Sequence, residues 1–165
     1  MRDYIQFLLD GEIVTERHLD PTMSVLQYLR ERRMKTGTKE GCAEGDCGAC
    51  TVILRELVDG KILTRSVNAC ILFVPTLDGK ELVTIESIGT PDKPDAIQKL
   101  VAEKHGSQCG FCTPGIVMSL VALQAGDTPK TPDTISEALA GNLCRCTGYG
   151  PIIDAAMAMP APKTA

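Results

Sequence analysis

Eight cysteines are the residues of this sequence best suited to chemistry, and they fall into two groups of four. Three members of the first group lie in the stretch GCAEGDCGACTV with the spacing C-x4-C-x2-C, and the fourth follows after nineteen further residues. This spacing is typical of a plant-type 2Fe–2S cluster, in which four thiolates hold two iron ions. The predicted ligands of this first site are Cys42, Cys47, Cys50 and Cys70.

Four glycines lie in or just before the first cysteine loop, at Gly37, Gly41, Gly45 and Gly48. Glycine permits positive φ values and a close approach of the backbone, so the loop can wrap an inorganic core. Turned backbone N–H groups then point at sulfur and offset the negative charge of the thiolates. An all-cysteine zinc site is the alternative, but zinc sites usually use two short cysteine knuckles, which a lone distant cysteine fits poorly.

The second group of cysteines lies in QCGFCTPG and NLCRCTGYG, with thirty-one residues between the two pairs. Its members are Cys109, Cys112, Cys144 and Cys146. The spacing C-x-x-C plus C-x-C is not diagnostic, so zinc and iron–sulfur both stay open on spacing alone. Helices predicted to begin at Thr113-Pro114 and at Pro151 follow these cysteines, and their N-termini would offer free N–H groups to anionic thiolates.

The first half of the chain must position the first loop, and its pattern predicts a small α+β domain over residues 1–88. Asp10-Gly11 and Asp59-Gly60 are hairpin turn signals. The stretch SVLQYLRERR has apolar residues at helical spacing. Strands are predicted over residues 4–9, 12–18, 51–58, 61–67 and 82–85.

The composition changes at GTPDKP, residues 89–94, which is typical of a linker. Four helices are predicted beyond it, around residues 97–104 and from Thr113-Pro114, Thr131-Pro132 and Pro151. The second of them, with the sequence GIVMSLVALQAG, is apolar nearly all round and should be buried. Short helices in this number indicate a compact bundle over residues 89–160, followed by a tail at 161–165.

The composition is that of a globular protein, with 44% hydrophobic and 23% charged residues and a net charge of −4, so nothing favours nucleic acid as a partner. The opening MRDYIQFLLDGE lacks the apolar core of a signal peptide, and no apolar run is long enough for a membrane span. We therefore expect a cytoplasmic protein, in which metal binding is a better use of eight cysteines than disulfides. We predict no catalytic residue, because the chain has no dinucleotide, phosphate-loop, nucleophile-elbow or zinc-protease motif.

The stretches GTKEGCAEGDCGACTV, VNAC, GSQCGFCTPG and AGNLCRCTGY together resemble the iron–sulfur portion of the xanthine dehydrogenase family of molybdenum hydroxylases. The resemblance covers about residues 4–157. It implies a plant-ferredoxin-like β-grasp domain followed by an all-α four-helix bundle, each with one 2Fe–2S cluster. The stretch SVNACILFVPTLDGKELVTIES looks closer to bacterial xanthine dehydrogenases than to the carbon-monoxide or hydroxybenzoyl-CoA branches.

The resemblance implies an electron-transfer subunit that relays single electrons from molybdopterin through the helical domain and the ferredoxin-like domain to FAD. Molybdopterin and FAD would sit on partner chains or domains, so a hetero-oligomer is expected. Gln108 matches a family position that hydrogen-bonds the pterin, and Cys146 matches the cluster ligand closest to it. The alternatives are the iron–sulfur subunit of an aldehyde, carbon monoxide or aromatic-substrate oxidoreductase, a free-standing electron carrier, and an all-cysteine zinc interaction module.

Overall fold

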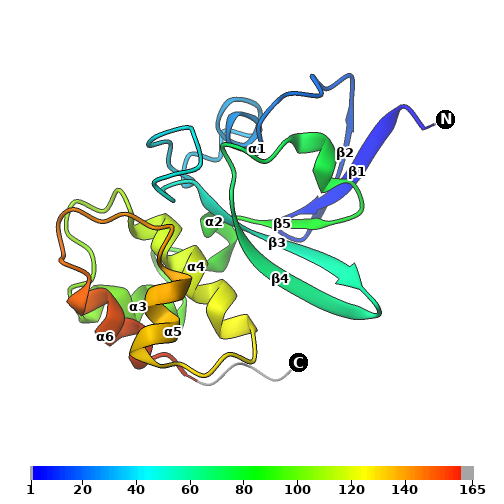
Figure 1. The fold of residues 1–165 in the computed structure, drawn as a ribbon. Helices are drawn as coiled ribbons and strands as arrows, with labels where there is room; N and C mark the ends of the chain where they lie inside the picture. Colours follow the sequence, from blue (N-terminus) through cyan, green and yellow to red (C-terminus); the bar gives the residue numbers. More distant parts are fainter. Residues whose placement is uncertain (1, 161–165) are drawn as a thin grey trace.

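A mixed five-stranded sheet and a group of helices make up the α+β fold of the computed structural model, which describes residues 2–160 (Figure 1). The strand order is β2-β1-β5-β3-β4, and β1 and β5 are parallel while the other neighbours are antiparallel. The tail predicted at residues 161–165 lies outside the described residues. The strands are β1 (Tyr4–Leu9), β2 (Glu12–Arg17), β3 (Thr51–Val58), β4 (Lys61–Asn68) and β5 (Glu81–Val83).

Two tight hairpins build most of this sheet, and both were predicted from their Asp-Gly turns. Asp10 and Gly11 have φ values of 54° and 87°, and Asp59 and Gly60 have values of 50° and 76°. Two successive residues with positive φ are the mark of the type I′ turn, whose twist matches that of the flanking strands. The predictions of the β1–β2 and β3–β4 hairpins are therefore confirmed.

A short helical segment covers one face of the sheet and leads into the first cysteine loop. It starts as α1 (Val25–Gln27), where Ser24 and Gln27 form a capping box, and continues as the π-helix η1 (Tyr28–Arg32). A helix was predicted over this stretch and is confirmed, but its second part is a π-helix. The Arg33 N–H there donates to the carbonyl oxygen of Tyr28, five residues earlier (3.0 Å). Buried side chains of this segment and of the strands form the first core, among them Phe7, Tyr28, Leu29, Val52, Leu54 and Leu82.

The prediction of a strand over residues 82–85 is wrong at its end. After the 3₁₀-helix η2 (Val74–Leu77), β5 ends at Val83, and the chain turns into the helix α2 (Ile85–Ile88). Thr84 causes this turn, because its hydroxyl accepts a hydrogen bond from the Glu86 N–H (3.3 Å) and caps the helix. Its own N–H donates to the Asp10 carboxylate (2.6 Å), which holds it against the first hairpin.

Four further helices form the second half of the described chain: α3 (Ala96–Glu103), α4 (Thr113–Ala125), α5 (Pro132–Ala138) and α6 (Gly150–Met157). All four lie where helices were predicted. The helix α4 begins at Thr113 itself, so Cys112 occupies the cap position, and the Thr113 hydroxyl lies 2.8 Å from that of Ser107.

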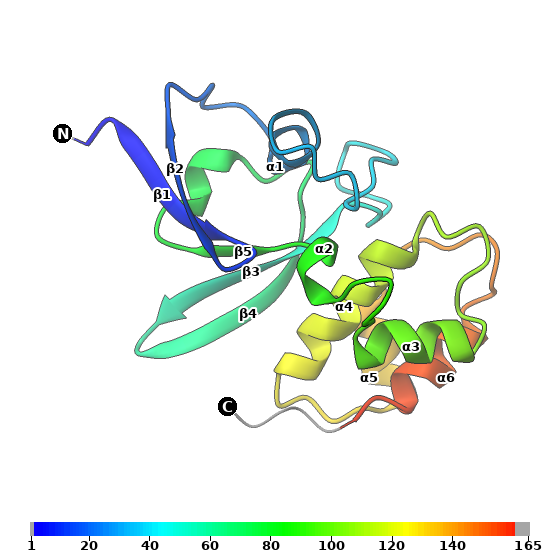
Figure 2. The same cartoon turned by 180° about the vertical axis from the view of Figure 1, so that it is seen from behind.

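The helix α4 lies between the sheet and the other helices, as Figure 2 shows from behind. Its central residues, Gly115 to Leu120, are buried, as predicted from its continuous apolar sequence, whereas both ends are half-buried or exposed. Met118 of α4 packs with Ile53 of β3 and Val83 of β5 in a small core cluster of its own. The two halves of the chain are therefore joined by apolar packing as well as by the linker. Within residues 2–160, no helix is both long enough and apolar enough to span a membrane.

Candidate metal centres

The first cysteine loop runs from the end of η1 to the start of β3, and Cys70 reaches it from just beyond β4. Cys50 is buried, whereas Cys42, Cys47 and Cys70 are half-buried. Ala43, Gly45 and Gly48 adopt positive φ values of 59°, 85° and 69°. Such left-handed residues reverse the direction of successive peptide groups, which lets several N–H groups face one point.

Backbone N–H groups of this loop donate to the cysteine sulfurs. The N–H groups of Asp46 and Cys47 lie 3.4 and 3.3 Å from Cys42 Sγ, and the Gly45 N–H lies 3.2 Å from Cys70 Sγ. Hydrogen bonds from the Glu44, Cys47 and Asp46 backbone lower the pKa of the Cys42 thiol to about 7. The loop thus stabilises negative charge on sulfur before any metal is considered.

Gly41 is required by the sulfur of the same loop. A Cβ atom at this position would lie 2.8 Å from Cys47 Sγ, closer than carbon and sulfur atoms tolerate. The backbone therefore passes directly over a thiol, as the glycine content of the loop led us to expect.

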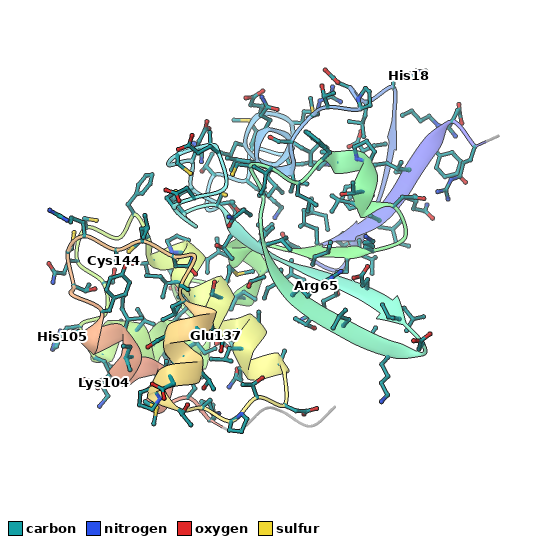
Figure 3. The ribbon with its side chains drawn as sticks, in the orientation of Figure 1. His18, Arg65, Lys104, His105, Glu137 and Cys144 are labelled. Atoms are coloured by element: carbon teal, nitrogen blue, oxygen red, sulfur yellow. The ribbon has the colours of Figure 1, made fainter. Side chains whose placement is uncertain are left out.

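The second group of cysteines lies on two loops at the helical end of the molecule, where Figure 3 labels Cys144. Cys109 and Cys112 directly precede α4, and Cys144 and Cys146 lie between α5 and α6. The Cys144 sulfur lies 3.2 Å from the Thr147 hydroxyl. The Cys144 N–H donates to the Tyr149 hydroxyl (2.8 Å), so Tyr149 holds the backbone of this loop, a role that sequence reasoning missed.

All eight cysteines fall into four pairs of neighbours, and in each pair one thiol contributes to a shift in the pKa of the other. The pairs are Cys42 with Cys47, Cys50 with Cys70, Cys109 with Cys146, and Cys112 with Cys144. Two pairs belong to each predicted site. In residues 2–160, no three histidine, cysteine, aspartate or glutamate side chains gather around one point that would hold a single metal ion.

Burial raises the pKa of the Cys50 and Cys112 thiols to about 12 each. Such thiols stay neutral at ordinary pH unless a cation supplies compensating charge. Cys109 and Cys146 are instead exposed, as is Gln108 beside them. The second site is therefore half-buried at Cys112 and Cys144 and exposed at Cys109 and Cys146, and Gln108 lies on the exposed side.

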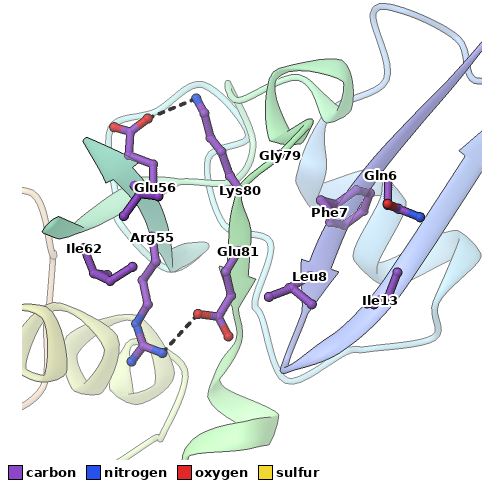
Figure 4. A pocket seen from close by; sticks show the side chains of 11 residues that line it. Gln6, Phe7, Leu8, Ile13, Arg55, Glu56, Ile62, Gly79, Lys80 and Glu81 are labelled. Carbon is purple, nitrogen blue, oxygen red and sulfur yellow. Dashed lines mark hydrogen bonds and ion pairs between the residues drawn. The ribbon is translucent and has the colours of Figure 1, made fainter. Parts of the chain in front are cut away.

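A groove of about 360 Å³ lies on the sheet, and Leu8, Ile13 and Ile62 are among its lining residues (Figure 4). Ion pairs of Arg55 with Glu81 (3.2 Å) and of Lys80 with Glu56 (3.4 Å) lie among its lining residues. None of the lining residues is a cysteine. The histidine His18 is likewise remote from the second group of cysteines, because it lies at the opposite end of the molecule from Cys144 (Figure 3).

The residues of both sites fit a 2Fe–2S cluster. Each site offers four sulfurs in two pairs, and the first adds inward N–H donors and a glycine over a thiol. Four cysteines are the usual ligands of such a cluster, which requires two sulfurs at each iron. When bound, a cluster of this kind supplies one-electron redox chemistry.

Comparisons with known proteins agree with this geometry. A family profile described as "2Fe-2S iron-sulfur cluster binding domain" matches residues 7–75, and a second, described as "[2Fe-2S] binding domain", matches residues 84–157. The chain therefore contains two 2Fe–2S-binding domains, one around each group of cysteines.

The chain is 49% identical over 162 residues to a xanthine dehydrogenase of Emericella nidulans, a match that covers 97% of this chain and 12% of that protein. It is 47% identical over 152 residues to aldehyde oxidase 1 of Oryctolagus cuniculus, covering 90% of this chain and 11% of the relative. The chain thus spans only about an eighth of the length of these curated relatives.

A solved chain of quinoline 2-oxidoreductase from Pseudomonas putida 86 superposes with a TM-score of 0.80 at 33% identity, covering 94% of this chain and 90% of that one. The aldehyde oxidoreductase of Desulfovibrio gigas gives the same TM-score at 34% identity, covering 93% of this chain and 16% of that one. Taken with the paired cysteines and the two matched cluster domains, these likenesses mean that the chain belongs to the xanthine dehydrogenase family of molybdenum hydroxylases, as its iron–sulfur electron-transfer region.

Proposed function

We propose that this chain passes single electrons from a molybdopterin cofactor to FAD within a xanthine dehydrogenase-like enzyme. The observation that carries the proposal is the presence of two groups of four free cysteines, each inside one of the two matched 2Fe–2S-binding domains. The xanthine branch is favoured by 49% identity to the Emericella nidulans enzyme. The aldehyde branch is the second candidate, because 47% identity to rabbit aldehyde oxidase 1 is nearly as high.

The ligands we propose are Cys42, Cys47, Cys50 and Cys70 for one cluster and Cys109, Cys112, Cys144 and Cys146 for the other. The pairing supports this assignment over a zinc module. A structural zinc site places four ligands around one ion, whereas a 2Fe–2S cluster has two irons and shares its four cysteines between them.

We further propose that the first half, residues 1–88, is a plant-ferredoxin-like β-grasp domain and that residues 89–160 form a four-helix 2Fe–2S domain. The mixed sheet with its parallel β1–β5 pair supports the first description. The four helices α3 to α6 and the irregular segment at residues 89–94 support the second.

Partner chains would carry the other two cofactors, in a cytoplasmic hetero-oligomer. The exposed pair of Cys109 and Cys146 is the side that a pterin-bearing partner would reach, with Gln108 next to it as a hydrogen-bonding group. The flavin partner would face the first loop. The 90% coverage of a separate quinoline 2-oxidoreductase chain supports a separate subunit here.

Metal analysis and EPR of anaerobically isolated full-length chain test the proposal. We expect about four irons with matching acid-labile sulfide and two distinct 2Fe–2S signals after reduction. Cys70→Ala should abolish only the first signal and Cys112→Ala only the second, so each variant is the control for the other. A colourless protein with zinc, or one signal that both substitutions remove, would refute it. Isolation from native cells without flavin- and molybdenum-binding proteins would favour a free-standing carrier instead.

A further inference from the structure

The two cysteine-bearing loops touch each other through their backbones. The Leu143 N–H donates to the Cys47 carbonyl oxygen at 3.0 Å. Cys47 belongs to the first site, and Leu143 directly precedes Cys144 of the second. A single hydrogen bond and one residue, Leu143, therefore separate Cys47 of the first site from Cys144 of the second.

Asn142 holds this contact in place from beside Leu143. Its side-chain Nδ2 donates to the Gly48 carbonyl oxygen and to Thr51 Oγ1, both at 3.1 Å. Its Oδ1 accepts a hydrogen bond from the Ser119 hydroxyl of α4 at 2.6 Å. The residue is only 4% exposed. Both donor hydrogens of the amide are therefore used, and the side chain links the first loop, β3 and α4 at one buried point.

Glycine makes the approach of the loops closer than any other residue would allow. Gly48 has a φ of +69°, and a Cβ atom on it would lie 2.2 Å from the Gly141 carbonyl oxygen. A Cβ atom on Gly115 would lie 2.1 Å from the Gly48 carbonyl oxygen. Backbone atoms, which cannot rotate away, lie on both sides of these contacts, so the spacing of the loops has little freedom.

We propose that Asn142 is a positioning residue that fixes the separation and orientation of the two 2Fe–2S sites. In this role its hydrogen bonds to Gly48 and Thr51 keep the Cys47–Leu143 contact closed, and the closed contact sets how strongly the two sites interact. This inference rests on the proposed function, because it requires a cluster at each site. A purely stabilising Asn142 would instead contribute to the stability of the fold without influencing the interaction between the sites.

Asn68 offers a matched control within the same loop. Its Nδ2 donates to the Gly45 carbonyl oxygen at 2.7 Å, so it too is an asparagine that holds the first loop through a carbonyl. Asn68 lies at the end of β4, on the same half of the chain as that loop. Asn68→Ala therefore loosens the first loop without cutting a link between the two sites.

The test is low-temperature EPR of fully reduced, full-length chain, in which two nearby paramagnetic clusters split or broaden each other's signals. We expect Asn142→Ala to retain iron and sulfide at both sites but to lose most of this mutual splitting. Asn68→Ala should keep the splitting and change only the first signal. Asn142→Ala with both clusters loaded and wild-type splitting would overturn the inference, whatever its thermal stability.

A milder variant decides the matter if Asn142→Ala fails to retain iron. Ser119→Ala removes only the hydroxyl that orients the Asn142 amide, and alanine is well tolerated in a helix. We expect it to weaken the splitting while both clusters stay in place, and unchanged splitting would overturn the inference. Failure of the proposed function is recognised separately, because the wild-type chain itself would then lack two signals.

Discussion

Gly115→Ala sets helix propensity directly against the close contact between the two halves of the molecule. Gly115 is the third residue of α4, and replacing a helical glycine by alanine gains about 1 kcal/mol in an isolated helix. The new Cβ atom, however, would lie 2.1 Å from the Gly48 carbonyl oxygen and 3.2 Å from its carbon. Because the obstruction is backbone, α4 or the first cysteine loop must move.

The loss of stability expected for Gly115→Ala can be estimated from the contacts that this movement disrupts. Overpacking of a buried contact costs about 1–3 kcal/mol. The displaced Gly48 oxygen also moves away from Asn142 Nδ2 (3.1 Å) and Thr51 Oγ1 (2.7 Å), and buried groups that lose partners cost about 1–3 kcal/mol more. After the gain in helix propensity, we expect a net destabilisation of about 3 kcal/mol. In a chain of this size that lowers the Tm by about 6–12 °C.

The change in Tm is measured by far-UV circular dichroism of the protein with both 2Fe–2S clusters bound, heated anaerobically at one fixed scan rate. Gly150→Ala is the control, because Gly150 also lies in a helix but a Cβ atom there meets nothing within 4 Å. The control should stay within about 1 kcal/mol of wild type. A Gly115→Ala variant as stable as wild type, or more stable, would show that the backbone contact between α4 and the first loop does not constrain the fold.

Two further predictions concern single hydrogen-bonded side chains. Burial acts to raise the pKa of Asp10, but hydrogen bonds from Lys35 and Thr84 outweigh it, so its pKa lies below the ordinary value of 3.8. The ionised Asp10 carboxylate therefore stabilises the fold above about pH 4, and this stabilisation is lost as the pH falls through the lowered pKa. Asp10→Asn should lower the Tm at pH 7 and make the Tm fall less steeply below pH 4 than it does in wild type. Parallel curves of Tm against pH for the two proteins would contradict this. Tyr149→Phe should leave the Cys144 N–H unpaired, lower the Tm by about 2–4 °C and alter only the second EPR signal. Two unchanged signals would show that the Tyr149 hydroxyl does not influence that site.

Both hairpins could be predicted from the sequence because an Asp-Gly turn is a local feature. The turn depends on two residues, and the C-x4-C-x2-C spacing that points to the first site lies within one loop. The early end of β5 escaped prediction because Thr84 acts as a helix cap while it is held by Asp10, which lies 74 positions away in the chain. The π-helix after Gln27 likewise has no signal in its amphipathic pattern.

The pairing of the thiols and the role of Asn142 could not be predicted for the same reason. The bond from Asn142 to Gly48 joins residues 94 positions apart, and a lone asparagine in a loop gives no hint of such a partner. Gly48 was recognised as a loop glycine, but its need to accommodate the Gly141 carbonyl oxygen is visible only once both halves are folded.

The packing of Met118 against Ile53 and Val83 has a consequence for dissecting the chain. A break in the segment at residues 89–94 would leave Met118 on one fragment and its two neighbours on the other. Each fragment would then expose to solvent an apolar surface that is buried in the intact chain. Fragments that carry one cysteine group each should therefore aggregate, or associate with each other when mixed, so the two halves are best expressed as one chain.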